Sequence, residues 1–356
     1  MTIVERLTQI ASMGASDVFI VAGLPLSYKI NNRMIQSDEK KLMPSDTAQL
    51  LQEIYALADN RDISILEERG DDDFAFAISG VARFRMNAYK QRGSLSAVIR
   101  VIMFNVPNLS SLGFTKENQD VILSLSELKK GLVLITGPAG SGKSTTLAAM
   151  IDHINSTRRN HIVTLEDPLE YLHNHKMSIV SQREVVTDTE NYITALRASL
   201  RQSPDVILLG EMRDHETMST AMTAAETGHL ILSTLHTVGA SNTIDRIIDA
   251  FPPAQQRQIA VQLAMVLQAV VSQQLVPAID GSVVPALEIM ILTPAIKNMI
   301  RESKVHQIDG VISQSRAEGM VTMDASLLDL YRRKIITDKT ALEYAQDPET
   351  LQKKLQ

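Results

Sequence analysis

The sequence predicts an α/β protein in which a smaller α+β domain precedes a domain built on a mostly parallel β-sheet. Its 356 residues exceed the length at which one hydrophobic core keeps growing, so two domains are expected. Residues 1–104 mix helical and strand-like segments, and residues 105–113 have linker composition. From residue 132 onward, short apolar runs alternate with helical stretches, the pattern of a parallel sheet covered on both faces. The second domain is therefore placed at 114–356.

The elements of the first domain follow from residue spacing and turn signals. Apolar residues at helical spacing predict a first helix over 3–13. Pro44, followed by Ser45 and Asp46, opens a second helix that reaches Leu57. Segments rich in β-forming or alternating residues predict strands at 18–22, 27–30, 74–78, 83–89 and 97–102. The last three are candidates for antiparallel pairing.

The second domain begins with four apolar runs that predict strands, at 132–135, 161–165, 206–209 and 230–233. After Pro253 the chain reads as mainly helical, with a possible strand pair around 275–291. The uncharged stretch 258–279 is long enough to test as a membrane span. Its five glutamines would be costly in lipid, so we interpret it as a core helix.

Composition narrows the classes of partner. The 35 Lys and Arg residues against 41 Asp and Glu residues give a net charge of -6, which disfavours nucleic acid as the main partner. The absence of cysteine excludes disulfides, Cys-ligated zinc and thiol catalysis, and it fits a reducing cytosol. Glu5 and Arg6 stand where a signal peptide would need its apolar core, so export is not expected.

A glycine-rich motif, GPAGSGKS, follows the first apolar run and precedes a helix-like stretch. This is the G-x-x-x-x-G-K-[ST] phosphate loop in the strand-loop-helix context that makes the motif credible. Lys143 is expected to reach the β- and γ-phosphates of a nucleoside triphosphate, and the Ser144 hydroxyl to bind Mg²⁺. The alternative is a glycine-rich turn without a ligand. The nucleotide-binding candidates are Gly137, Pro138, Ala139, Gly140, Ser141, Gly142, Lys143, Ser144 and Thr145.

Polar residues follow the other three apolar runs. Because a ligand of an open α/β sheet lies beyond the carboxyl ends of its strands, Glu166, Glu211 and His236 are expected at one edge. Glu211 is our candidate for the carboxylate that orients or deprotonates the attacking water and contacts Mg²⁺. Its alternative role is to cap the helix that starts near Arg213. Asp167 is either a second acid of the site or an ordinary turn residue.

Histidines and arginines complete the candidate set. His229 and His236 could report loss of the γ-phosphate to a neighbouring element, or either could be structural. Arg83 and Arg85, with Arg92 and Arg100 nearby in the sequence, could supply the cation that a lone ATPase domain often lacks, and the alternative is a solvated basic face. Arg197 could face the site or pair with Glu190. We interpret the other histidines considered as metal ligands as structural or exposed. These are His153, His161, His173 and His175.

Several long blocks in fixed order resemble the bacterial secretion ATPase superfamily, and most closely its type IV pilus retraction (twitching motility) ATPases. These blocks are TLEDPLEYL, QREV, ALRASLRQSPDVILLGEMRD, AAETGHLILSTLHT and TIDRIIDAFP. In that family TLEDPLEY corresponds to the Asp box, VILLGEMRD to the Walker B segment, and TGHL with TLHT to the His box. The resemblance implies that Glu211 is the catalytic glutamate and Glu166 an Asp-box acid. The His-box residues are then His229 and His236, and the arginines that reach phosphate are Arg85 and Arg100.

The resemblance also implies an architecture and partners. It implies a PAS-like N-terminal domain, a RecA-like ATPase domain, a hexameric ring, ATP with Mg²⁺, and a cytoplasmic place beside the membrane. The partner would be the inner-membrane platform protein of the pilus. The block AIKNMIRE at 295–302 and the lack of a four-cysteine zinc motif favour retraction over assembly. Phe19 departs from the histidine common in relatives. The alternatives are a pilus-assembly or type II secretion ATPase, or a catalytically weak nucleotide-binding subunit.

Overall fold

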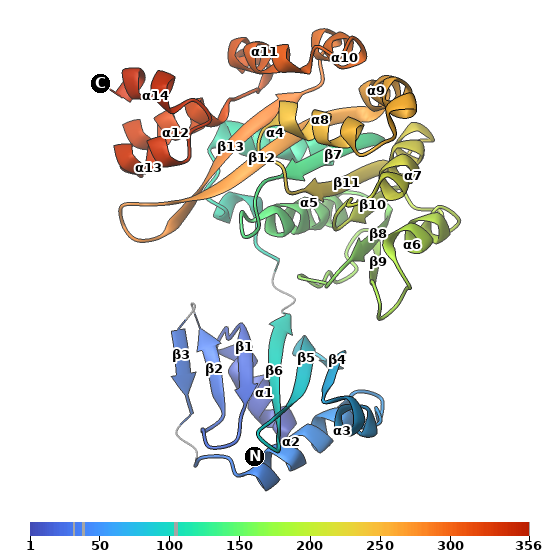
Figure 1. Ribbon diagram of the computed structural model, residues 1–356, viewed down its shortest axis with the longest axis vertical. Coiled ribbons are helices and arrows are strands. Elements are labelled where there is room, and N and C mark those ends of the chain that lie inside the picture. The colour runs from blue at the N-terminus through green and yellow to red at the C-terminus, as the bar shows by residue number, and fades with distance from the viewer. Residues whose placement is uncertain (31–32, 38–39, 103–105, 356) are drawn as a thin grey trace. The chain divides into compact units, whose positions relative to one another are not determined.

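The computed structural model describes residues 1–30, 33–37, 40–102 and 106–355 (Figure 1). The chain forms two compact units, Met1–Asn105 with Leu169–Leu172, and Val106–Pro168 with His173–Gln356. The domain boundary expected at residue 104, and the first residue of the expected linker, lie outside the described residues. Within that linker, Leu109–Ser111 forms a 3-10 helix (η1), and Leu109 is buried in the core of the second unit.

The first unit is an antiparallel sheet packed against helices. Its six strands lie in the order β3-β2-β1-β6-β5-β4, and they include all five predicted strands. The strands are β1 (Asp17–Ile20), β2 (Ser27–Ile30), β3 (Arg33–Gln36), β4 (Asp71–Ile78), β5 (Ala82–Gln91) and β6 (Ser94–Ile102). The helices are α1 (Ile3–Ser12), α2 (Pro44–Leu57) and α3 (Ser64–Arg69). Strand β3 and helix α3 were not predicted.

Alternation along β5 decides which side chains leave the core of the first unit. Phe84 and Met86 are fully buried beneath the helices. Since successive residues of a strand point to opposite faces, Arg83 and Arg85 lie on the other face of the sheet. Arg100 of β6 is directly opposite Arg85 in the ladder, so the two candidate arginines share that face.

The second unit confirms the predicted mostly parallel sheet. Its seven strands lie in the order β13-β12-β7-β11-β10-β8-β9, and only the pairing of β12 with β13 is antiparallel among the described strands. The strands are β7 (Gly131–Thr136), β8 (His161–Glu166), β9 (Ile179–Glu184), β10 (Val206–Leu209), β11 (Leu230–Leu235), β12 (Leu267–Pro277) and β13 (Val283–Ile291). The first four predicted runs all became strands, and β9 was missed.

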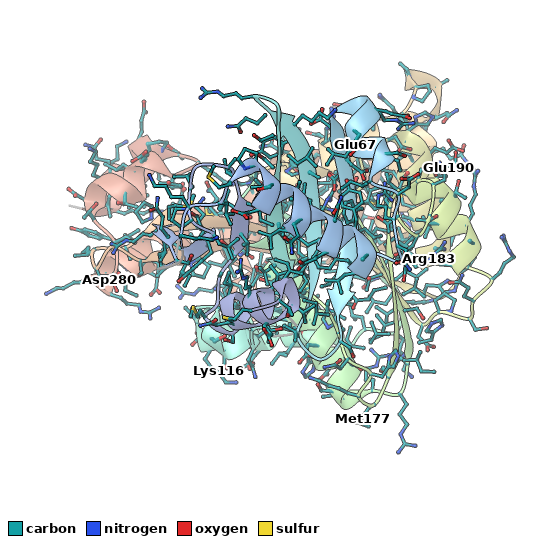
Figure 2. All side chains as sticks on the ribbon, turned by 90° about the horizontal axis from the view of Figure 1, so that it is seen from below. Glu67, Lys116, Met177, Arg183, Glu190 and Asp280 are labelled. Atoms are coloured by element: carbon teal, nitrogen blue, oxygen red, sulfur yellow. The ribbon has the colours of Figure 1, made fainter. Side chains whose placement is uncertain are left out.

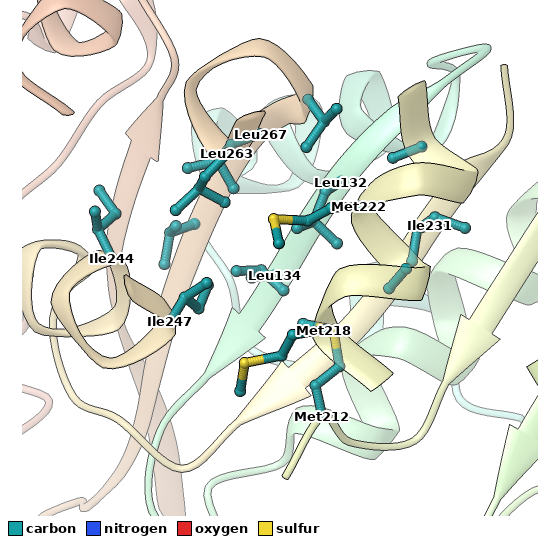
Figure 3. Close-up of a cluster of buried hydrophobic side chains, with 14 of the residues drawn as sticks. Leu132, Leu134, Met212, Met218, Met222, Ile231, Ile244, Ile247, Leu263 and Leu267 are labelled. Atoms are coloured by element: carbon teal, nitrogen blue, oxygen red, sulfur yellow. The ribbon is translucent and has the colours of Figure 1, made fainter. Parts of the chain in front are cut away.

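Helices cover both faces of this sheet, which explains its continuous apolar runs. On one face lie α4 (Lys116–Ser126) and α5 (Lys143–Thr157). The other face is covered by α6 (Tyr192–Ser199), α7 (His215–Glu226), α8 (Ala240–Asp249) and α9 (Pro253–Val266). Figure 3 shows Leu132 and Leu134 of β7 packed in the core on this second face. Residues Val133 and Ile135 belong to the core on the α5 face.

The C-terminal part consists of helices beside the β12–β13 hairpin. Asp280, labelled in Figure 2, lies in the turn that joins the two strands. Val276 and Ala286 of the hairpin share a buried cluster with Leu327 and other residues of the last helices. These helices are α10 (Pro294–Arg301), α11 (Ile308–Gln314), α12 (Met323–Arg332), α13 (Asp338–Glu343) and α14 (Pro348–Leu355), with 3-10 turns η2 (Val305–Gln307) and η3 (Arg316–Glu318).

The interpretation of 258–279 as one core helix was wrong. Helix α9 ends at Val266, and β12 begins at Leu267. Strand β12 lies between β7 and β13 and is buried over most of its length, so β-branched residues such as Val270 and Val271 pack well there. Among the described residues, no helix combines the length and the apolarity that crossing a bilayer requires.

Candidate nucleotide-binding site

The phosphate loop joins β7 to α5 in the predicted strand-loop-helix order. Gly137 and Gly142 have φ angles of 140° and 83°, which side chains rarely adopt. A Cβ atom on Gly137 would lie 2.1 Å from the backbone oxygen of Gln273. A Cβ atom on Gly142 would lie 2.8 Å from the side-chain Nε2 atom of Gln273. Backbone conformation therefore favours glycine at both positions, and the contact with a backbone oxygen also requires it at Gly137.

Lys143 and Ser144 open helix α5 at the end of this loop. The Lys143 side chain is buried, and its Nζ donates hydrogen bonds to Gly137 O at 2.9 Å and Pro138 O at 2.8 Å. Its ammonium group is thus folded over the loop. Ser144 and Thr145 follow in the first turn of the helix, where backbone N–H groups favour an anion.

The residues present fit the phosphates of a nucleotide. The hydroxyl of Ser141 is buried and makes no hydrogen bond to the described residues, so it has donor and acceptor capacity to spare. Ser144 and Glu211 are the predicted ligands of Mg²⁺, and this remains a prediction.

Hydrogen bonds tie the strand ends of the site together. Gly210 N donates to Leu165 O at 2.8 Å, which joins the end of β10 to the end of β8. The Thr234 hydroxyl donates to Gly210 O at 2.6 Å, which joins β11 to β10. Gly137 N donates to Leu235 O at 3.2 Å, which joins the phosphate loop to β11. Glu166 is the last residue of β8, and Glu211, His236 and the loop follow strands that finish at the same edge.

Glu211 is a nearly buried carboxylate, 9% exposed, just beyond β10. Its Oε1 atom lies 2.6 Å from Arg213 Nη2, and its Oε2 atom lies 3.5 Å from His236 Nε2. The alternative role of helix cap is excluded because α7 begins at His215 and is capped by Asp214. The structure thus brings Glu211 and His236 together.

A tyrosine that the sequence analysis missed lies among these acids. Tyr192 is the first residue of α6, and its hydroxyl oxygen lies 2.9 Å from the position that a Cβ atom would take on Gly210. Burial raises the pKa of Tyr192, and the charges of Glu211, Asp167 and Glu166 raise it further. The phenol therefore stays protonated as a hydrogen-bond donor beside three carboxylates. No local pattern marked it, because an aromatic residue after a helix cap also suits a core position.

The segment after His236 is fixed by the neighbouring strands. Gly239 N donates to Ser272 Oγ at 3.0 Å, and Ala240 N donates to Glu288 Oε1 at 2.7 Å. Burial raises the pKa of Glu288. Strands β12 and β13 therefore hold the start of α8, which follows the histidine.

The two candidate histidines lie at opposite ends of β11. His236 follows the strand at the edge with Glu211, whereas His229 precedes Leu230 and its Nδ1 lies 2.9 Å from Ala224 O. Six residues of strand span about 20 Å, so the two rings do not meet within one chain. That His229 senses the loss of the γ-phosphate stays a prediction.

The candidate arginines belong to the first unit and have acidic partners there. Arg85 forms two contacts with Asp73, at 3.1 and 3.2 Å, and Arg100 lies 3.5 Å from Asp17. Their action on a nucleotide stays a prediction. Arg197 pairs with Glu216 at 2.7 Å on the surface, not with Glu190.

Comparison with known proteins gives a consistent result. A family model described as Type II/IV secretion system protein matches residues 1–346. The chain is 44% identical over 349 residues to the type IV pilus retraction ATPase PilT of Pseudomonas aeruginosa, covering 98% of this chain and 99% of the relative. It is 39% identical to the type IV pilus ATPase PilU of the same organism, covering 96% and 88%.

A solved structure also matches. The crystal structure of the pilus retraction motor PilT with bound ADP superposes with a TM-score of 0.89 at 44% identity, and the match covers 99% of each chain. The predicted resemblance to secretion ATPases is therefore confirmed. The phosphate loop, the acids at the strand ends and these full-length matches place the chain in the type II/IV secretion system protein family.

Proposed function

We propose that this chain is a Mg²⁺-dependent ATPase motor that drives retraction of a type IV pilus. The observation that carries the proposal is the shared edge of the parallel sheet, where the phosphate loop and the nearly buried Glu211 both follow strand ends. Retraction as the task is taken from the relatives, because the full-length match at 44% identity is to a pilus retraction ATPase.

The roles of the residues follow from their chemistry. The loop backbone and Lys143 hold the β- and γ-phosphates, and Ser144 with Glu211 holds Mg²⁺. When bound, the metal ion neutralises charge on the phosphate oxygens. Glu211 orients the attacking water, and Glu166 and His236 stand beside it at the same edge. The buried Tyr192 phenol stays protonated near these acids, so it adds no further negative charge to the site.

Assembly and partners complete the proposal. The protein forms a homo-oligomeric ring, most simply a hexamer, of a PAS-like domain (1–104), a linker (105–113) and a RecA-like domain (114–356). Arg85 and Arg100 contribute positive charge to the nucleotide phosphates. The ring works in the cytoplasm and meets the membrane only through the platform protein of the pilus. Nucleic acid is no partner, in keeping with the net charge of -6.

Deletion of the protein tests the direction of the motor. Loss of a retraction ATPase leaves abundant surface pili that cannot shorten, whereas loss of an assembly ATPase leaves none. We expect abundant pili and no twitching movement, measured by electron microscopy and by colony spreading. Cells without surface pili would contradict a role in retraction.

Turnover of the purified chain tests the enzyme itself. We expect hydrolysis that needs Mg²⁺ and is unchanged by added DNA. Absence of turnover, with ATP still bound, would favour the regulatory nucleotide-binding subunit.

A further inference from the structure

A glutamine outside every sequence motif contacts the phosphate loop. Gln273 lies on β12, and since Ala269 and Val271 of this strand belong to the core on the α5 face, alternation places Gln273 on that face too. Its side chain is 3% exposed. Its Nε2 atom donates to Ser141 O at 2.7 Å, and its Oε1 atom accepts from the Thr146 hydroxyl at 2.8 Å.

These two hydrogen bonds bracket the part of the loop that binds phosphate. Ser141 precedes Gly142, Lys143 and Ser144, and Thr146 follows them in the first turns of α5. The amide group of Gln273 thus bonds to the chain on both sides of the residues whose backbone N–H groups face an anion. A buried amide is costly unless its donor and acceptor are both satisfied, and here each end finds a partner on this loop or helix.

The backbone of Gln273 also contacts the loop, because its carbonyl oxygen leaves room only for glycine at position 137. The Nε2 atom of its side chain lies close to Gly142. The loop therefore rests on this one residue at its beginning, in its middle and at its end.

We infer that Gln273 is a positioning residue that holds the phosphate loop in its nucleotide-binding conformation. The inference rests on the proposed nucleotide site. Gln273 acts through Ser141 and Thr146 and does not itself touch the nucleotide. The loop amides bind the phosphates before and during hydrolysis alike, so loss of their positioning weakens affinity more than it slows the chemical step.

The test compares Gln273→Met with Gln274→Met in the full-length protein. Methionine keeps the length of the side chain and removes both hydrogen bonds. Gln274 is the matched control, because it is the next residue on the same strand and its amide donates to Tyr344 O, away from the loop. Binding of ADP is measured by titration calorimetry, hydrolysis by phosphate release, and folding by the unfolding temperature without nucleotide.

For Gln273→Met we expect the Kd for ADP and the KM for ATP to rise about tenfold, with kcat changed less than about threefold. In Gln274→Met all three values stay within about twofold of wild type. A merely structural glutamine would lower the unfolding temperature and leave the Kd of the folded protein unchanged.

The outcomes separate this inference from the proposed function. If wild type does not bind ADP, both fail. If wild type binds ADP and folded Gln273→Met binds it equally well, the inference is overturned and the ATPase stands. If Gln273→Met does not fold, Thr146→Val decides, because it removes one of the two hydrogen bonds. A Kd for ADP raised about threefold supports the inference, and an unchanged Kd overturns it.

Discussion

Glu211 has a cation on one side of its carboxylate and an imidazole on the other. Arg213 lies 2.6 Å from one oxygen and His236 lies 3.5 Å from the other, and the carboxylate is 9% exposed. Contacts on both oxygens hold the carboxylate in one orientation. These properties suit a residue that orients water for attack on the γ-phosphate.

Changing Glu211→Gln tests this role. The amide has nearly the same shape but cannot accept a proton, so kcat should fall by about two to four orders of magnitude. ATP should still bind, because the phosphate loop is untouched. Its Kd is measured by titrating the inactive variant with ATP, which that variant leaves unhydrolysed. Glu216→Gln is the control, since Glu216 pairs with Arg197 on the surface and should leave kcat unchanged. Equal kcat in both variants would assign the water to another carboxylate.

A second prediction at this scale concerns stability and pH in the first unit. Asp72 is nearly buried and accepts two hydrogen bonds from Arg61, at 2.8 Å each, and one from the Tyr55 hydroxyl at 2.9 Å. The hydrogen bonds from Arg61 hold the pKa of Asp72 below its usual value. A carboxyl whose pKa is lowered by folding stabilises the protein above its unfolded pKa, near 4, and this stability is lost as pH falls through the folded pKa.

Replacing Asp72→Asn should therefore destabilise the first unit by about 1 to 3 kcal/mol at pH 7, and by less at pH 3. Hydrogen exchange of the β4 amides in the whole protein measures the opening free energy. Asp73→Asn, next to it on the exposed face, should cost less than about 1 kcal/mol. An Asp72→Asn effect that does not shrink on acidification would contradict the ionic origin.

At the scale of elements, contacts with strand β12 hold the phosphate loop in place. Gly137→Ala would place a Cβ atom 2.1 Å from a backbone oxygen, which no side-chain movement can relieve, in a backbone conformation of φ 140°. Gly140→Ala meets no atom within 4 Å and has only the strain of its φ angle of 76°. Comparing alanine at the two positions therefore separates the cost of the steric clash with β12 from the cost of backbone strain.

We expect Gly137→Ala to lower the free energy of unfolding by about 3 kcal/mol, and Gly140→Ala by about 1 kcal/mol. Urea unfolding of the nucleotide-free protein measures both. Equal losses would mean that contact with β12 does not fix the loop.

Elements with local signals were predictable from the sequence. The phosphate loop is a contiguous motif, and parallel strands finish at one edge, so the neighbourhood of Glu166, Glu211 and His236 followed from chain order. Strand β9 was missed because it lies at the edge of the sheet, and its mixed sequence IVSQRE shows neither alternation nor an apolar run. Strand β12 was read as a helix because burial on both faces removes the alternation that marks a strand.

Side chains that act through distant contacts were not predictable. Gln273 bonds to residues 127 and 132 positions away, and Tyr192 reaches acids that follow two other strands. Glutamine and tyrosine at such positions look like ordinary buried residues until the fold brings their partners near. The capping question at Glu211 was likewise open in sequence, because only the structure shows that α7 begins at His215 with Asp214 as its cap.

At the scale of the whole molecule, the proposed ring predicts that an arginine acts on the site of a neighbouring subunit. Arg85 and Arg100 face each other on the exposed side of the first unit's sheet. Arg85→Ala and Arg100→Ala should each fold normally, because both side chains are solvent-accessible. The variant of the acting arginine should lose most of its kcat and retain ADP binding, since that charge serves the transition state.

Mixing two inactive variants tests whether that arginine crosses between subunits. A Glu211→Gln subunit keeps its arginines, and the arginine variant keeps Glu211, so a mixed ring contains some complete sites. After unfolding and refolding together in equal amounts, turnover should recover to about one quarter of wild type if the arginine acts across the interface. The control mixture pairs Glu211→Gln with Lys143→Ala, whose defects fall in the same site, and should stay inactive. Recovery in neither mixture, with rings confirmed by light scattering, would place the arginine and Glu211 in the site of one subunit.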